Sequence, residues 1–220
     1  MNKSIVILKK NLFIHNGEEY DFDKFNDMNI MLKSNIKIVL LEEELYVKQF
    51  ESEMKRNKIY EFIDYKINNE FPQNGDILYD FEKSNNLISI YYIKGAKRIE
   101  KISERAKRIE VKPIQFIVKD VMMKILKNNI FNCKVLTKFM EYYYYISFKD
   151  GLFNYNFIEK DKEMVLDTII KNDDFGEIYV DNSLKELSLT NKFKIININI
   201  GELLNERIYE KQRFHSGEVL

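Results

Sequence analysis

The sequence has 220 residues, of which 35 are Lys or Arg and 35 are Asp or Glu, so its formal net charge is zero. A chain without a basic surplus is not expected to bind nucleic acid in general, because neutralising phosphates requires one. The single cysteine, Cys133, excludes a disulfide framework and a cysteine-based zinc site and is typical of a reducing compartment. The two histidines, His15 and His215, are too far apart in sequence to favour a metal centre or a histidine-based triad. No apolar run approaches the roughly 20 residues of a membrane span, and we expect a cytoplasmic protein.

The N-terminal 41 residues predict three short strands, a helix and a longer strand. Lys9-Lys10-Asn11 separates two apolar runs in the manner of a hairpin turn. The last strand is almost continuously apolar, which is typical of a central, fully buried strand. The predicted strands span residues 4–8, 12–15, 19–22 and 36–41, and the predicted helix carries Phe25, Met28, Met31 and Leu32.

Residues 42–110 predict a separate block of three strands and two helices. The first helix ends before Phe71-Pro72, since proline disfavours helical backbone in the residue that precedes it. The second helix opens at Gly95 and places an apolar stripe on one face, from Ala96 to Ile109. The predicted strands are residues 45–50, 76–81 and 87–93, and the predicted helices are residues 53–70 and 95–109.

The remaining residues predict a strand meander followed by alternating helices and strands. An extended segment around Pro113 precedes a helix that carries Val121 to Leu126. Lys149-Asp150-Gly151 is a good hairpin turn, and Ser183-x-x-Glu186 matches a capping box that opens a short helix. The predicted segments are extended residues 112–118, strands 131–139, 142–148, 152–158, 177–180 and 193–198, and helices 160–171 and 203–208.

Two parts of the chain share nearly the same order of elements. Residues 131–210 follow the order β-β-β-α-β-α-β-α, and residues 4–41 with 111–128 follow it closely. This order predicts an α/β fold of mixed α+β character, built from a duplicated ribonuclease H-like unit with a small inserted α/β subdomain. The expected parts are a first half (1–41 plus 111–130), an inserted subdomain (42–110), a second half (131–212) and a tail (213–220).

Residues 36–126 carry a resemblance to one group of proteins. The segment combines a strand at Tyr46–Phe50, a helix that runs through Glu70 into Phe71-Pro72, an acidic strand at Asp76–Phe81, and Lys112-Pro113-Ile114. It resembles PilM of type IV pilus machines and the cytoplasmic domain of the L protein of type II secretion. The resemblance implies the actin-like ATPase fold, which is a duplicated ribonuclease H-like fold.

Three turns depart from the pattern of nucleotide-binding relatives. Actin-like ATPases hold phosphates with loops rich in Gly, Asp and Thr, because backbone N–H groups must approach the phosphates and an Asp must position Mg²⁺. The corresponding turns here are Leu8–Asn11, Phe139–Tyr142 and Val180–Ser183, and none of them contains glycine. The sequence therefore predicts a pseudo-ATPase that is not an enzyme, with no cofactor, no catalytic residues and no metal site.

The resemblance also implies a partner. PilM-like proteins grip the N-terminal segment of a PilN-like membrane-anchored protein in the groove between the inserted subdomain and the first half. In this sequence the candidate partner-binding residues are Phe62, Tyr65, Phe71, Pro72 and Tyr79, expected to be exposed beside the edge strand. The alternative interpretation is that these aromatic residues close the core of the inserted subdomain.

The leading functional hypothesis is a non-catalytic scaffold subunit of a type IV pilus or type II secretion assembly platform. It would lie in the cytoplasm at the inner face of the cell membrane, without a span of its own. It would link the PilN-like protein to the assembly motor, with the assembly ATPase as a second candidate partner. Two alternatives stay open: an actin-like ATPase or sugar-kinase relative that still binds nucleotide, and an unrelated phage or mobile-element α/β interaction protein.

Overall fold

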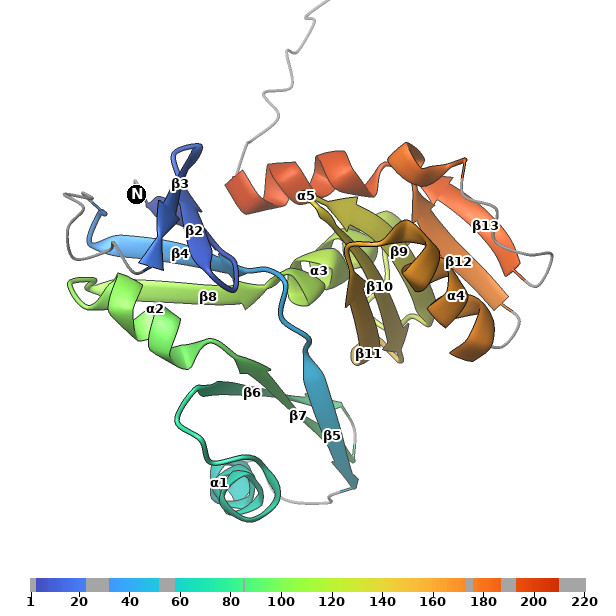
Figure 1. Cartoon of the computed structure of the whole chain (residues 1–220). Helices are drawn as coiled ribbons and strands as arrows, with labels where there is room; N and C mark the ends of the chain where they lie inside the picture. The colour runs from blue at the N-terminus through green and yellow to red at the C-terminus, as the bar shows by residue number, and fades with distance from the viewer. Residues whose placement is uncertain are drawn as a thin grey trace, which may run out of the picture.

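The computed structural model describes residues 3–22, 32–51, 58–84, 86–172, 176–186 and 193–209. Within them the chain forms three β-sheets, two of five strands and one of three, with helices packed against them (Figure 1). The helix predicted from Phe25 to Leu32 falls almost wholly outside the described residues, as does the predicted tail at 213–220.

The first five-stranded sheet has the order β3-β2-β1-β4-β8. Strand β1 pairs antiparallel with β2 and parallel with β4, and β4 pairs parallel with β8. The central strands are the near-continuous apolar runs, because their side chains are covered on both faces of the sheet. The strands are β1 (Ser4–Leu8), β2 (Leu12–His15), β3 (Glu18–Asp21), β4 (Asn35–Leu40) and β8 (Arg108–Pro113).

The second five-stranded sheet repeats this arrangement. Its order is β11-β10-β9-β12-β13, and each neighbouring pair has the same direction as its counterpart in the first sheet. The predicted duplication is therefore confirmed. The strands are β9 (Cys133–Phe139), β10 (Tyr142–Lys149), β11 (Leu152–Glu159), β12 (Gly176–Asp181) and β13 (Phe193–Ile198).

Two equivalent helices join the halves. Helix α3 (Ile114–Leu126) follows the fifth strand of the first sheet, and α5 (Ile200–Tyr209) follows the fifth strand of the second. The two helices pack together and bury Ile117, Val121 and Leu204 in one core cluster that also includes residues of both sheets. Helix α4 (Lys162–Asn172) covers the other face of the second sheet over a separate cluster.

The inserted block forms its own sheet, with the order β5-β7-β6. Helix α1 covers one face of this sheet, where Ile88 and Ile90 of β7 are buried. Tyr91 and Ile93 of the same strand point to the other face and join the large cluster shared by the two halves. The elements are β5 (Tyr46–Glu51), α1 (Ile59–Glu70), β6 (Ile77–Ser84), β7 (Leu87–Lys94) and α2 (Ala96–Ser103).

Tertiary pairing overrides the helix predicted for residues 95–109. Helix α2 ends at Ser103, and the N–H groups of Lys107 and Arg108 both donate to the carbonyl oxygen of Ser34. The chain then enters β8 before residue 110, the predicted boundary of the inserted block. Parallel pairing with β4 satisfies its backbone groups there. The boundary itself stays a prediction.

Two further local predictions are wrong. The segment 112–118 is not extended throughout, because α3 begins at Ile114 and buries residues at helical spacing. Ser183 does not cap the next element; the Asp181 carboxylate accepts a hydrogen bond from the N–H of Ser183 at 2.9 Å and so caps η3 (Asn182–Leu184).

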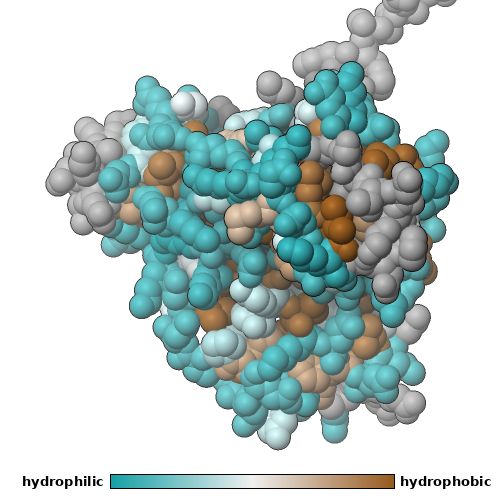
Figure 2. Space-filling model, turned by 45° about the vertical axis from the view of Figure 1, so that its right-hand side comes forward, coloured by the Kyte–Doolittle hydropathy of each residue, from teal (hydrophilic) through white to brown (hydrophobic). Residues whose placement is uncertain are grey.

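The surface carries most of the charge. In the view of Figure 2 it is largely hydrophilic, with hydrophobic residues in separate patches between hydrophilic ones. Among the described residues, no helix is both long and apolar enough to cross a bilayer.

Candidate partner-binding groove

A cavity of about 150 Å³ lies where the inserted sheet meets the first half of the chain. Strand β6 contributes Leu78, Tyr79 and Asp80, and β8 contributes Val111. Phe116 of α3 and apolar residues at the ends of β4 and β7 complete the lining. We call this cavity the groove. Its walls are apolar apart from Asp80 and the tyrosine hydroxyls.

Both strands along the groove are sheet edges. Among the described residues, β6 pairs only with β7 and β8 pairs only with β4, so each presents one row of backbone N–H and C=O groups outside its sheet. Such an edge can accept an added strand from another chain, with pockets for alternate side chains providing specificity. The groove thus combines free backbone groups with apolar walls.

The five predicted site residues lie in three places: the core of the inserted block, its exposed surface and the lining of the groove. Phe62 and Phe71 belong to the core of the inserted block, and the rings of Phe71 and Tyr79 lie 5.8 Å apart in a T-shaped contact. Phe71 is only 6% exposed, so the expectation that it is exposed is wrong. Tyr65 is 63% exposed on α1, and Pro72 is exposed with its carbonyl oxygen accepting a hydrogen bond from the Tyr79 hydroxyl. Of the five, Tyr79 alone lines the groove.

Sequence reasoning missed the neighbours of Tyr79. Leu78 and Asp80 flank it on β6 and also lie on the groove lining, whereas Phe81 packs only in the cluster beneath α1, which Tyr79 contacts as well. Because side chains alternate along a strand, the two sets occupy opposite faces of the inserted sheet. The alternation of β6 was the available signal, but it does not tell which face α1 covers.

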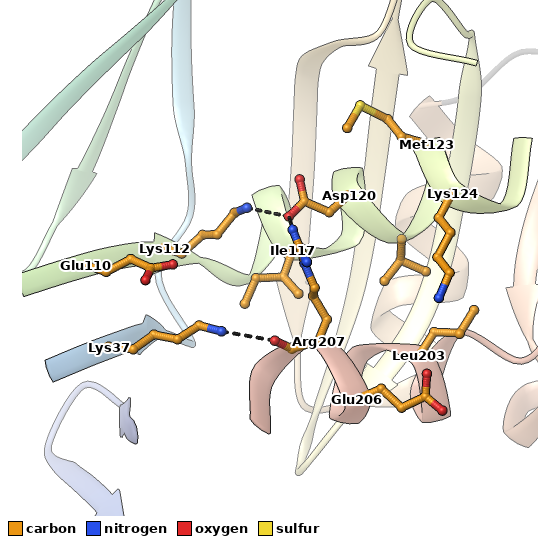
Figure 3. Close-up of a pocket in the computed structure, with 11 residues that line it drawn as sticks. Lys37, Glu110, Lys112, Ile117, Asp120, Met123, Lys124, Leu203, Glu206 and Arg207 are labelled. Atoms are coloured by element: carbon orange, nitrogen blue, oxygen red, sulfur yellow. Dashed lines mark hydrogen bonds and ion pairs between the residues drawn. The ribbon is translucent and has the colours of Figure 1, made fainter. Parts of the chain in front are cut away.

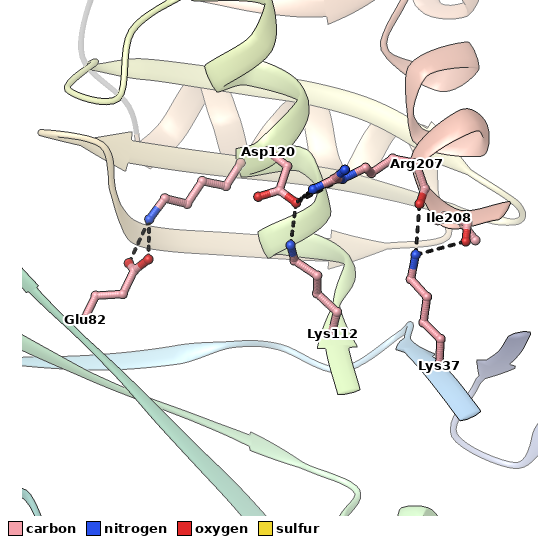
Figure 4. Close-up of polar contacts among 7 residues, drawn as sticks. Lys37, Glu82, Lys112, Asp120, Arg207 and Ile208 are labelled. Carbon is pink, nitrogen blue, oxygen red and sulfur yellow. Dashed lines mark hydrogen bonds and ion pairs between the residues drawn. The ribbon is translucent and has the colours of Figure 1, made fainter. Parts of the chain in front are cut away.

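A partly buried ion pair links the inserted sheet to α3. The Lys119 ammonium donates to both carboxylate oxygens of Glu82 on β6, at 2.6 and 2.8 Å (Figure 4). The Tyr91 hydroxyl donates to the same carboxylate at 2.7 Å. Burial, followed by the charge of Glu82, raises the pKa of Tyr91, so this hydroxyl keeps its proton and remains a donor. These contacts hold β6 and β7 in place beside the groove.

The chain's own side chains occupy the turn of the first hairpin. The N–H of Lys10 donates to the Glu42 carboxylate at 3.3 Å, and the Arg98 guanidinium donates to the Lys9 carbonyl oxygen at 2.7 Å. Arg98 also pairs with Glu43 at 2.6 Å. Glu42 is buried in left-handed backbone, with φ of 64°. An amide that faces a carboxylate in this way is not available to a second anion.

The other two turns are similarly occupied by protein groups. Glu141, in the turn after β9, pairs with Lys160 at 2.9 Å, and this pairing lowers the pKa of Glu141. The buried Asp181 carboxylate accepts hydrogen bonds from Thr137, Ser183 and the N–H of Gly201. Among the residues that the structure describes, no group of three or more His, Cys, Asp or Glu side chains could hold a metal ion.

Comparison of sequences gives no relative: no known protein family matches the chain, and no curated protein does. Comparison of structures gives several. A protein of Bacteroides thetaiotaomicron with an actin-like ATPase fold and unknown function is 10% identical, with a TM-score of 0.55 over 96% of each chain. The cytoplasmic domain of EpsL, an inner membrane component of the type II secretion system of Vibrio cholerae, is 9% identical, with a TM-score of 0.52 over 95% of each chain.

The third likeness is to a chain of a PilM–PilN type IV pilus biogenesis complex. It is 8% identical, with a TM-score of 0.55 over 92% of this chain and 90% of that chain. The resemblance to PilM and to the type II secretion L protein is thereby confirmed at the level of structure. Identities this low show shared architecture rather than shared activity. The chain has the actin-like ATPase fold, with two ribonuclease H-like sheets and an inserted subdomain.

Proposed function

We propose that the chain is a non-catalytic scaffold subunit of a type IV pilus or type II secretion assembly platform. It would act in the cytoplasm at the inner face of the cell membrane, and would link a PilN-like membrane-anchored protein to the assembly motor. The inserted block, residues 42–110, would be its partner-binding part. The fold shared with the EpsL domain and with the PilM–PilN complex supports this context.

One observation carries the proposal: an apolar groove between two free strand edges. An extended peptide could pair with β6 or β8 while every second side chain enters the groove. Asp80 is the single charged residue among the described residues of the lining. Its carboxylate also accepts a hydrogen bond from the N–H of Phe81 at 2.8 Å. The preferred partner is therefore an extended apolar segment with one Lys or Arg placed to reach Asp80.

The groove can be tested with a synthetic peptide that matches the N-terminal segment of any single-span membrane protein encoded beside this chain. We expect saturable binding by calorimetry, weakened at least about ten-fold by Leu78→Lys, because the substitution places an ammonium group against apolar walls. Asp80→Lys should weaken binding of the same peptide through charge repulsion. Asp80 is exposed, so this second variant should fold normally.

Tyr65→Lys is the matched control for Leu78→Lys, since it adds one positive charge to the same subdomain at an exposed helix position outside the groove. Unchanged binding is expected. Binding that resists both Leu78→Lys and Asp80→Lys but is lost in Tyr65→Lys would move the partner site to the exposed face of α1.

A nucleotide titration tests whether the chain has lost the ATP binding that an actin-like ATPase requires. We expect no saturable binding of ATP with Mg²⁺ at about 1 mM, because the amide of the first turn faces Glu42 and Asp181 is committed to structural hydrogen bonds. Calorimetry with ATP, with and without Mg²⁺, is the measurement. Micromolar, Mg²⁺-dependent binding would favour the alternative that this chain is a nucleotide-binding actin-like ATPase.

A further inference from the structure

A second cavity lies away from the groove, between the first sheet, α3 and α5 (Figure 3). Its volume is about 670 Å³, within the range of roughly 300–1,000 Å³ typical of small-molecule sites. Apolar residues of the two helices line part of it, namely Ile117, Val121 and Leu203. Charged side chains of β8, α3 and α5 also reach it.

Hydrogen-bond donors outnumber acceptors on one side of this cavity. The Lys112 ammonium and the Arg207 guanidinium both donate to a single oxygen, Oδ2 of Asp120, the latter through Nε at 3.2 Å and Nη2 at 3.1 Å (Figure 4). Three donors therefore converge on one carboxylate oxygen, which has two lone pairs. Two positive charges share one negative charge there.

The other charged residues of the cavity do not remove this surplus, because the lining carries four cationic side chains and three carboxylates: Lys37, Lys112, Lys124 and Arg207 against Glu110, Asp120 and Glu206. Glu110 pairs with Lys3 at 2.9 Å. The Lys37 ammonium donates to neutral groups, the carbonyl oxygens of Arg207 and Ile208 at 3.0 and 3.2 Å, near the end of α5. The helix dipole makes that end partly negative, which stabilises Lys37 in place but adds no formal charge. The side of the cavity near Lys112 and Arg207 thus keeps a net positive charge.

We propose that this cavity binds a phosphate group carried on a short apolar body. Lys112 and Arg207 would donate to the phosphate oxygens, since a guanidinium presents its N–H groups in a fork that matches phosphate geometry. The apolar body would pack on Met123 and Leu203, which are the half-buried apolar side chains of the lining. The Asp120 carboxylate accepts hydrogen bonds from the same two cations, so it competes with the phosphate for them and keeps the affinity of the cavity for the ligand moderate.

Titration of the full chain with three probes tests the site. By calorimetry or amide NMR shifts, phenyl phosphate is expected to bind about ten-fold more tightly than inorganic phosphate, and phenol not to bind at about 10 mM. Equal affinity for the two phosphates would overturn the role of the apolar surface. Binding of phenol as tight as that of phenyl phosphate, or no saturable binding of phenyl phosphate at about 10 mM, would overturn the anion site.

Variants separate a built site from non-specific charge attraction. Arg207→Gln, at a side chain that is 62% exposed, should weaken phenyl phosphate binding about ten-fold. Asp120→Asn should strengthen it, because the competing negative charge is lost while an amide oxygen still accepts from Lys112. Lys160→Gln removes an exposed positive charge elsewhere and should change nothing. Unchanged binding in Arg207→Gln, or weaker binding in a folded Asp120→Asn protein, would overturn the proposal.

Discussion

Gly151→Ala is expected to destabilise the fold by about 3 kcal/mol or more, the largest effect that we predict for a single methyl group. Gly151 lies in the turn between β10 and β11 with φ of 72°, a backbone region that favours glycine. A Cβ atom there would lie 2.0 Å from the carbonyl oxygen of Asn129. The N–H of Gly151 also donates to the Phe131 carbonyl oxygen at 2.8 Å, so the turn cannot move away without losing this bond.

Two other glycines separate backbone strain from steric overlap. Gly75 has φ of 69°, but a Cβ atom added there would meet no atom within 4 Å, so Gly75→Ala should cost about 1 kcal/mol. Gly176 has neither feature, and Gly176→Ala should stay within about 0.5 kcal/mol of the parent chain. Urea unfolding of the three variants gives the free energies. A Gly151→Ala cost equal to that of Gly75→Ala would mean that the loop at Asn129 relaxes.

Cys133 supplies an independent measure of the same unfolding. It is 6% exposed, and burial raises the pKa of its thiol to about 12. Because the thiolate is the reactive form, labelling at pH 8 should be slow in the folded chain and fast once β9 is exposed. Labelling rates should therefore rise from the parent chain through Gly75→Ala to Gly151→Ala.

The duplicated fold could be predicted because its signals are local. Short turns separate the apolar runs of β1 and β2 and those of β9, β10 and β11, and Lys149-Asp150-Gly151 has the turn chemistry that left-handed backbone requires. Element order alone then limits the topology to a few arrangements. The strand order that both five-stranded sheets share is one of these arrangements.

The errors arise where tertiary contacts decide. In sequence, Ile109 continues the apolar stripe of α2. In the structure it belongs to β8 and lies opposite Ile36 of β4, because the edge of β4 offers its backbone hydrogen-bond partners. A groove does lie between the inserted block and the first half, but most of the residues expected to line it lie elsewhere. Phe62 and Phe71 are aromatic because they fill the core beneath α1, whereas Leu78 and Asp80 gain their place on the lining only from the docking of β6 beside β8.

That docking depends on the Glu82–Lys119 pair, and Glu82→Ala is expected to cost about 2 kcal/mol, less than for a fully buried pair because the Glu82 side chain is 35% exposed. The substitution removes the carboxylate from a lysine that is 8% exposed and leaves its ammonium with no carboxylate partner among the described residues. It also removes the acceptor of the Tyr91 hydroxyl, which is buried against the same surface. Peptide binding in the groove should weaken as well, because β6 and β7 form one wall.

The double variant Glu82→Leu with Lys119→Met distinguishes two explanations for that cost. If the cost comes from leaving a charge buried and unpaired, the apolar pair should recover most of the stability and of the peptide affinity. Glu141→Ala is the control: it breaks an ion pair of similar length whose side chains are 63% and 59% exposed, and should change the free energy of unfolding by less than about 1 kcal/mol. A double variant as unstable as Glu82→Ala would mean that the ion pair itself favours docking of the inserted subdomain, and that the groove depends on this charge as well as on its apolar walls.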